Sequence, residues 1–443
     1  MTANRVQRLS RSLAIFVPLL CALLTPAGAV GQEPIVPLRL SFSDPGARSM
    51  GFGGAFVALA DDATAAFANP AGLVQLAKPE VSMEGRHWDY STSYAKGGRV
   101  EGQPSGFGID TRVGLETARS ENTITGLSFL SVAHPLGKGS LAFFRHELAN
   151  FAFSGETQGF FGGGTNCCQN RFFDQRMATD VNFVSYGLSG AYRITERLAV
   201  GLGAIYHETS LTSTAEVFLP DEDPELGLLA PTSYFAERSY LSQHLFADDT
   251  DWSFTGGFLL RLSNSWRIGG VYRQGLEAGV TVETTAGQAN DLGVSPGTLV
   301  NRITGIPVQF PWVLGLGFAY RAPDGGLTVT FQWDHFQYST IVESPGLEDV
   351  TVDDTDELHL GAEHVFLRTT PVVAVRAGAW FDPDHQVRST GDDPFARALQ
   401  PRGDNEMHYS AGLGVALQNL QVDVAVDFAD PVNTVSLSAI FGF

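Results

Sequence analysis

Four arginines occupy positions from which a guanidinium group could bind a carboxylate: Arg193, Arg261, Arg321 and Arg376. Each lies in a segment of alternating polar and apolar residues, and the alternation directs its side chain to the polar face. A guanidinium binds a carboxylate through two parallel hydrogen bonds, so these residues are candidates for holding the acidic head group of an amphiphile. The alternative, which we expect for most of them, is ion pairing with acidic residues of the same face or of the N-terminal region: Asp334, Glu363, Asp423, Asp427, Asp61 and Asp62.

A second candidate binding element is the stretch from residue 151 to residue 173, which is rich in glycine and aromatic residues. Its first four aromatic residues are Phe151, Phe153, Phe160 and Phe161. We expect a long loop whose rings form an apolar groove for a hydrophobic molecule. Packing of the loop against itself explains the same composition equally well, so both interpretations stand.

Catalytic and metal chemistry have little support. The ten histidines are scattered, and the chain has no HExxH or GxSxG motif and no glycine-rich phosphate loop after a strand. The acidic runs near residues 221–223 and 349–357 lack the dense spacing of a calcium loop, so solvated loops are expected. We predict no catalytic residue, no metal site and no cofactor. For the adjacent Cys167 and Cys168 we expect a local staple within a loop.

The composition limits the class of protein that must position these residues. The chain has 443 residues, including 49 glycines and 31 phenylalanines, and only 17% of its residues are charged. Its mean hydropathy is +0.01, as in a transmembrane β-barrel, where apolar and polar residues alternate along each strand. The formal net charge of −20 argues against nucleic acid as a partner, because phosphate binding needs clustered cations.

The N-terminal 31 residues have the pattern of a signal peptide. Arg5, Arg8 and Arg11 precede an apolar run at residues 13–24, and Ala27-Gly28-Ala29 is a small-residue cleavage site. No later apolar stretch approaches the ~18 residues of a membrane helix. We therefore expect residues 1–31 to direct export of the chain.

From about residue 80 the sequence becomes a series of alternating segments, the clearest being residues 420–428. About fourteen such segments follow one another, and most have the ~10 residues that cross a bilayer when tilted. Short turns alternate with long connections between them. We predict an all-β fold in which residues 80–443 form a transmembrane antiparallel β-barrel of about fourteen strands, with short periplasmic turns and long outer loops.

The last segment carries apolar residues on one face and ends in Phe441 and Phe443. A final alternating strand with a terminal aromatic residue is the kind of signal that outer-membrane barrel-assembly machinery recognises. We expect these two phenylalanines to serve as the assembly signal.

Residues 32–79 have a different character, being small, rich in glycine and not strand-like. A short helix is expected from Asp62 to Ala68, with Asp61 or Asp62 as its N-cap. Asn69-Pro70 should end it, because the residue before a proline disfavours helix. The segment is too small to fold alone, and we expect it to plug the lumen of the barrel.

The run from Ala47 to Leu73, ARSMGFGGAFVALADDATAAFANPAGL, resembles the N-terminal hatch of the FadL-type outer-membrane transporters of long-chain fatty acids and hydrocarbons. The triplet Asn69-Pro70-Ala71 matches the hatch motif of that family. The resemblance implies a plugged fourteen-strand barrel that carries hydrophobic molecules inward. It also implies a kink in the third strand, here about residues 139–151, that opens the wall sideways. We expect the break between Asn150 and Gly155.

The resulting hypothesis is a channel in the cell outer membrane for passive uptake of long-chain fatty acids or other hydrophobic small molecules. Outer-membrane lipid, lipopolysaccharide and the barrel-assembly machinery are its other expected partners. Its expected gate is the part of the hatch containing Asp61, Asp62, Asn69, Pro70 and Ala71. A similar hatch pattern occurs in barrels of type IX secretion, so the alternative is a barrel that binds ligand or protein without transporting small molecules.

Overall fold

A computed structural model describes residues 42, 44–162, 171–287, 289–290, 293–294, 297–343, 349–392 and 394–443. The predicted signal peptide and the pair Cys167-Cys168 lie outside the described residues. None of the helices in the described ranges has the length and hydrophobicity of a membrane-spanning helix.

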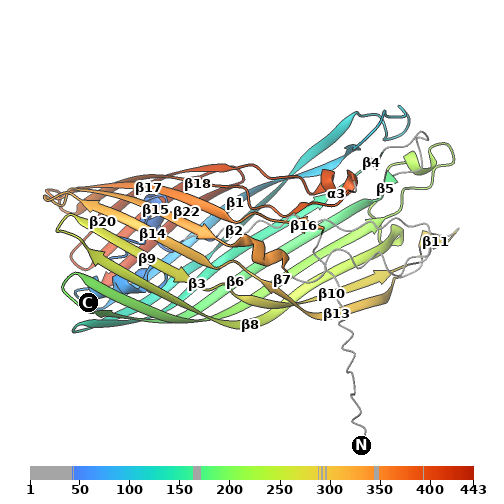
Figure 1. The fold of residues 1–443 in the computed structure, drawn as a ribbon. Coiled ribbons are helices and arrows are strands. Elements are labelled where there is room, and N and C mark those ends of the chain that lie inside the picture. The colour runs from blue at the N-terminus through green and yellow to red at the C-terminus, as the bar shows by residue number, and fades with distance from the viewer. Residues whose placement is uncertain are drawn as a thin grey trace, which may run out of the picture.

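Fourteen antiparallel strands close into a barrel, as predicted (Figure 1). The first and last strands of the wall pair with each other, from Glu80 with Gly442 to Tyr90 with Val432. Two strands of the wall are interrupted, so each consists of two segments. The strands in order are β1 (Glu80–Arg99), β2 (Gly114–Leu136), β3 (Gly139–Glu156), β6 (Asp174–Arg193), β7 (Leu198–Phe218), β8 (Ser239–Arg261), β9 (Trp266–Arg273) with β10 (Glu277–Ala286), β13 (Thr298–Gln309) with β14 (Val313–Arg321), β15 (Leu327–Phe336), β17 (Thr355–Phe366), β18 (Val372–Asp382), β20 (Glu406–Ala416), β21 (Leu420–Phe428) and β22 (Val432–Gly442).

The wall is apolar outside and polar inside. In β21, Val422 and Val424 are more than a third exposed, whereas Asp423, between them, is fully buried. A water-soluble protein would bury the valines and expose the aspartate. The observed orientation is that of a barrel surrounded by lipid.

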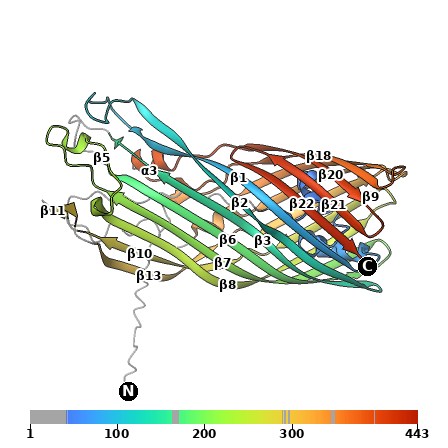
Figure 2. The ribbon, with the colours of Figure 1, turned by 180° about the vertical axis from the view of Figure 1, so that it is seen from behind.

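Short turns join the strands at one end of the barrel and long connections join them at the other. We call these the turn end and the loop end. The loop end carries the small elements β4 (Phe160–Phe161), β5 (Arg171–Phe172), β11 (Ala289–Asn290) and α3 (Pro394–Leu399), while the C-terminus lies at the turn end (Figure 2). Further small elements of the long connections are η3 (Gly227–Leu229), η4 (Ala236–Arg238), β12 (Gly293–Val294), η5 (Tyr338–Val342), β16 (Val350–Thr351) and β19 (Arg388–Ser389).

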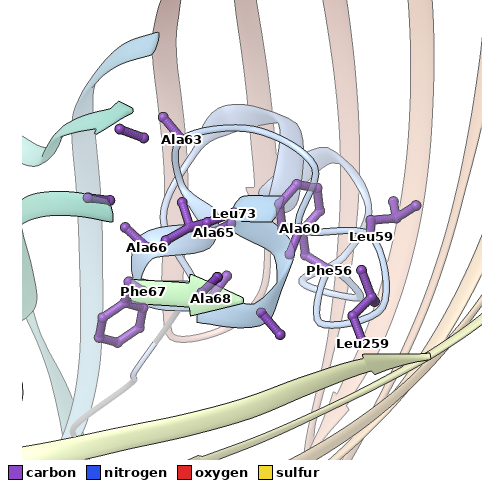
Figure 3. Close-up of a cluster of buried hydrophobic side chains, with 14 of the residues drawn as sticks. Phe56, Leu59, Ala60, Ala63, Ala65, Ala66, Phe67, Ala68, Leu73 and Leu259 are labelled. Atoms are coloured by element: carbon purple, nitrogen blue, oxygen red, sulfur yellow. The ribbon is translucent and has the colours of Figure 1, made fainter. Parts of the chain in front are cut away.

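The segment before β1 contains α1 (Ala47–Gly51), α2 (Ala65–Ala68) and the 3-10 helix η2 (Pro70–Gln75). Its small apolar side chains pack together and against Leu259 of β8 (Figure 3). Helix α1 contacts β18, β20, β21 and β22, whereas η2 contacts β3, β6, β7 and β8 on the facing part of the wall. We call residues 44–79 the hatch.

Helix α2 is shorter than predicted, and its N-cap is Thr64 rather than Asp61 or Asp62. The Oδ1 atom of Asp62 accepts a hydrogen bond from the amide of Thr64 (2.9 Å), which holds the preceding turn out of the helix. The predicted stop at Asn69-Pro70 is correct, and Pro70 then opens η2, where its missing N–H costs nothing.

Glycines in the wall allow the hatch backbone to approach closely. A Cβ atom at Gly201 of β7 would lie 2.3 Å from the amide nitrogen of Ala71, and one at Gly378 of β18 would lie 2.2 Å from that of Gly53. A Cβ atom at Gly361 of β17 would lie 2.3 Å from the carbonyl oxygen of Phe52. Any larger residue at these positions would displace the hatch or the strand.

Candidate functional site

A cavity of about 810 Å³ lies toward the loop end, and we call it the outer cavity. Strands β1, β2, β6, β7 and β8 line one side, and the connection between β18 and β20 covers the other. Its apolar lining includes Phe160, Phe172, Met177, Leu211 and Leu245. Its ionisable lining residues are Arg402, Asp404, Glu406 and Asp430, with Tyr94 beside them.

A dense apolar cluster, which includes Phe183 and Phe310, adjoins the outer cavity through Met177 and Leu211. The rings of Phe183 in β6 and Phe310, between β13 and β14, meet edge to face with centroids 4.7 Å apart. Beneath them a small cavity of about 50 Å³ adjoins Phe67 of the hatch and Leu148 of β3. The interruptions of the two broken strands line this small cavity, since it also borders residues 274–276 and 310–311.

The wall lacks main-chain pairing along part of the boundary between β2 and β3. Strands β2 and β3 pair only between Phe129–Leu136 and Gly139–His146. Beyond these residues β2 continues to pair with β1, and β3 continues to pair with β6. We call the unpaired boundary, between residues 114–128 and 147–156, the lateral seam.

A β-bulge lies where the lateral seam begins. The register of β3 against β6 shifts between Glu147 and Ala149, so Leu148 has no residue opposite it. Side chains bridge the seam at its far end, where the amide of Ser154 donates to Ser120 Oγ at 3.0 Å. The break therefore begins at Glu147, ahead of the predicted position between Asn150 and Gly155.

A second large cavity, of about 410 Å³, lies beside the hatch toward the turn end. Its arginines are engaged with carboxylates. Arg376 contacts Glu363 at 2.7 Å and Asp423 at 2.6 Å, and all three side chains are at least 95% buried. Arg321 reaches Asp61 of the hatch at 3.0 Å.

The other two candidate arginines have different surroundings. Arg193 donates to the carbonyl of Val74 in the hatch (2.6 Å). Arg261 lines neither the outer cavity nor the cavity beside the hatch. It is exposed at the turn end and donates to the carbonyl of Glu196 (2.7 Å).

The four candidate phenylalanines do not form an exposed groove. Phe151 and Phe153 belong to β3, which extends to Glu156, and their rings are 98% buried against Tyr90 and Tyr94 of β1. Phe160 lines the outer cavity. The ring of Phe161 is buried near the guanidinium groups of Arg99 and Arg171, which stand 5.6 and 5.9 Å from its centroid.

The hatch triplet lies against the wall. The Nδ2 group of Asn69 donates to the carbonyls of Val57 (2.9 Å) and Phe258 (3.0 Å), and its Oδ1 accepts from the amide of Ala71 (3.2 Å). At the end of the chain, Phe441 and Phe443 are about half exposed on the outer surface of the barrel and stack on each other.

The sequence interpretation missed a buried cluster of Asp334, Glu357 and His359 inside the wall. The available signal was the spacing, because Glu357 and His359 are two residues apart and therefore share a face of their strand. The partner strand and its register, which bring Asp334 opposite Glu357, were not readable from the spacing.

Residues 171–430 match the family model described as outer membrane protein transport protein (OMPP1/FadL/TodX). The chain belongs to this family. The match covers more than half of the sequence, and it includes strands β6 to β21. Membership together with the closed barrel places this family member in the outer membrane. A comparison with curated proteins finds no significant match.

Solved structures show the same fold. A FadL homologue from Pseudomonas aeruginosa is 14% identical with a TM-score of 0.60, covering 92% of this chain and 99% of its own. The toluene transporter TodX from Pseudomonas putida is 14% identical with a TM-score of 0.55, covering 91% and 99%. The monoaromatic hydrocarbon channel CymD is 15% identical with a TM-score of 0.50, covering 90% and 97%.

Proposed function

We propose that this family member is an outer-membrane channel for neutral hydrophobic small molecules. The apolar lining of the outer cavity supports this function most directly. Its volume of about 810 Å³ is within the range of pockets that enclose small organic ligands. Solved structures of the same fold are named as a FadL homologue and as a toluene transporter, so the substrate class must come from the charges of this chain.

The charges in the outer cavity favour a neutral substrate over a carboxylate. Among the described residues that line it, Arg402 is the single cation, against the three carboxylates of Asp404, Glu406 and Asp430. Arg402 also lies 3.5 Å from Asp384. The surface of the outer cavity is therefore net negative. It would repel the anion of a fatty acid, because like charges brought together across an interface cost free energy. Long-chain fatty acids remain the alternative substrate class.

Deeper in the barrel, the arginines that could hold a carboxylate are occupied. Arg376 is buried between Glu363 and Asp423, and Arg321 contacts Asp61. An incoming carboxylate would have to displace a bonded one. A neutral molecule makes no such demand.

The proposed route leads from the outer cavity through the apolar cluster to the small cavity above the hatch, and then out through the lateral seam. Leu148 supports this route, because it lines the small cavity and is also the extra residue of the bulge where the seam begins. A hydrophobic molecule would thereby enter the lipid directly without crossing the polar cavity at the turn end. In this proposal the hatch residues Asp61, Asp62, Asn69, Pro70 and Ala71 keep the turn end closed and move only locally.

The experiment fills the outer cavity. Ala215 of β7 is 97% buried and lines it, so Ala215→Trp should obstruct the cavity. Leu202 lies on the same strand with 71% exposure on the outer surface, and Leu202→Trp is the matched control. Uptake of radiolabelled toluene is measured in cells whose own hydrocarbon channels have been deleted.

The proposal predicts that Ala215→Trp reduces uptake to the level of cells without the channel, whereas Leu202→Trp leaves it unchanged. Surface labelling and heat-modifiable gel mobility confirm equal amounts of folded barrel. Equal toluene uptake by both variants, or no uptake by the unmodified protein, would overturn the proposal and favour a binding barrel.

A further inference from the structure

Three ionisable side chains meet inside the wall, beside the hatch loop at residues 53–57. Asp334 of β15 and Glu357 of β17 are opposite each other in the strand register, and His359 follows Glu357 on the same face. The Nε2 atom of His359 lies 3.3 Å from Asp334 Oδ2 and 3.3 Å from Glu357 Oε2. All three side chains are more than nine-tenths buried.

The other ring nitrogen of His359 is fixed by the hatch. Nδ1 lies 2.7 Å from the carbonyl oxygen of Gly53, which can only accept a hydrogen bond. Nδ1 therefore carries a proton. In the neutral imidazole, Nε2 then presents its lone pair to the two carboxylates, and within the part of the chain that the structure describes it has no hydrogen-bond partner of suitable geometry.

A lone pair and two carboxylates repel one another at this distance unless positive charge lies between them. The spacing suits a metal ion. Ligand atoms bound tetrahedrally at ~2.0–2.2 Å are separated from each other by about 3.3 Å, which is the distance found here. The three ligand atoms all lie within 4.8 Å of one another.

We propose that Asp334, Glu357 and His359 bind one divalent transition-metal ion, with Zn²⁺ as the reference ion. An imidazole nitrogen combined with carboxylates suits Zn²⁺, Mn²⁺ or Fe²⁺, whereas Ca²⁺ and Mg²⁺ prefer oxygen ligands alone. The proton on Nδ1 completes the arrangement, because metal-binding histidines usually donate their second N–H to a carbonyl or carboxylate.

The ion would fasten the hatch to the wall. Gln332 donates to the same Asp334 Oδ2 atom at 2.6 Å. Its Oε1 atom accepts hydrogen bonds from the hatch amides of Phe56 (2.9 Å) and Val57 (2.8 Å). Two ligands of the ion are therefore hydrogen-bonded to the hatch, one directly through Gly53 and one through Gln332.

A second cluster of similar composition, Asp382, Glu406 and His408, serves as an internal comparison. There the Nδ1 atom of His408 lies 2.7 Å from Asp427, and Nε2 is 4.0 Å from Glu406. The ring of Trp380 stands between the two histidine rings, so the clusters are neighbours. Because this second cluster could also bind a metal ion, a metal titration must distinguish an ion bound at His359 from one bound at His408.

The test counts bound metal on the full chain, purified from outer membranes in detergent and stripped with a chelator. Zn²⁺ is added, excess is removed by gel filtration, and the bound ion is measured by mass spectrometry. His359→Gln should lose one equivalent of Zn²⁺ relative to the unmodified protein, and Glu357→Gln should bind it more weakly. His364→Gln is the matched control, since His364 is exposed on the outer face of the same strand.

Heat-modifiable mobility establishes that each variant is folded. Two results would overturn the metal site: no Zn²⁺ retained by the unmodified protein, or the same amount retained after His359→Gln. In the first case a proton on Nε2 would neutralise the cluster in place of a metal ion.

A second measurement tests the link to the hatch. Hydrogen exchange of the peptide containing Phe56 and Val57 should be slower with Zn²⁺ than with chelator in the unmodified protein. The difference should vanish in His359→Gln. If the protein binds Zn²⁺ but the hydrogen-exchange rate of this peptide is the same with Zn²⁺ and with chelator, the ion does not fasten the hatch to the wall. Neither readout involves uptake, so these results and those of the toluene experiment are independent.

Discussion

Asn69 joins three parts of the molecule through one side chain. It bonds the preceding hatch loop at Val57, the wall at Phe258 and its own helix at Ala71. It is fully buried, and a Cβ atom at Gly257 of β8 would lie 2.2 Å from its Oδ1 atom. Asparagine is needed here because both a donor and an acceptor are used.

Asn69→Ala should therefore loosen the hatch and leave the barrel intact. Several buried backbone groups lose their partner, at about 1–3 kcal/mol each. Protease cleavage within residues 44–79 should accelerate, with heat-modifiable mobility unchanged and toluene uptake altered. Cleavage at the unmodified rate would show that the hatch does not depend on this side chain.

His385 gives the loop end a dependence on pH. Burial opposes its protonation, but the carboxylate of Asp382 and the carbonyl of Pro383 outweigh burial and raise its pKa to about 9, from an ordinary value near 6.5. The stabilisation is thus complete below pH ~6.5 and is lost as the pH rises through the folded-state pKa near 9. The ring also stacks on Tyr338, with centroids 4.5 Å apart.

His385→Gln should raise the rate at which protease cleaves residues 383–405 at pH 7. The ratio of the cleavage rate of the variant to that of the unmodified protein should fall toward one at pH 10. At that pH the histidine of the unmodified protein is neutral, and the variant has no histidine at this position. A ratio that stays constant between pH 7 and pH 10 would contradict a role for the charged ring.

For single residues, the sequence predicted the direction in which a side chain points better than it predicted the residues that the side chain contacts. Alternation correctly turned Arg376 toward the lumen, and Glu363 and Asp423 were among the acidic residues considered as its partners. The same parity failed to show that Arg261 is exposed and donates to the carbonyl of Glu196 in the turn before β7. The cluster at His359 depends on the register of two strands and on a hatch carbonyl, and neither is encoded in local spacing.

Among the elements, β3 carries the feature on which the proposed route depends. Its bulge at Leu148 coincides with the start of the lateral seam. Deleting Leu148 should restore a continuous register and allow β3 to pair with β2 along more of its length. Toluene uptake should then fall toward background in a folded barrel.

The matched control is Leu148→Ala, which keeps the extra residue and hence the bulge. It should retain uptake. Full uptake by the deletion variant would mean that hydrophobic molecules leave by another path, and the lateral route would be wrong.

The hatch and the wall are also fitted to each other as elements. Gly201→Ala would place a methyl group 2.3 Å from the amide of Ala71, so the hatch must move or the strand must bend. Overpacking of this kind costs about 1–3 kcal/mol. We expect faster hydrogen exchange in residues 69–76, measured against Gly85→Ala, whose added Cβ would meet its nearest atom at an ordinary 3.6 Å. Equal exchange in the two variants would contradict the fit.

For the molecule as a whole, the fold was readable because the membrane imposes a strict pattern. Lipid outside and water or hatch inside require alternation in every strand, and short turns mark one end. Fourteen strands were expected and fourteen are found. The interruption of the wall at residues 274–276 was not predicted, and neither was β13 over Thr298–Gln309.

The central claim is that the outer cavity selects neutral hydrophobic molecules, and a paired uptake measurement tests it most directly. Methyl laurate and laurate share a hydrocarbon chain and differ in charge at pH 7. Cells carrying the channel should take up methyl laurate faster than cells without it. The channel should increase the uptake of laurate only slightly. Arg402→Gln should leave ester uptake unchanged. Faster uptake of laurate than of its ester, abolished by Arg402→Gln, would contradict the account.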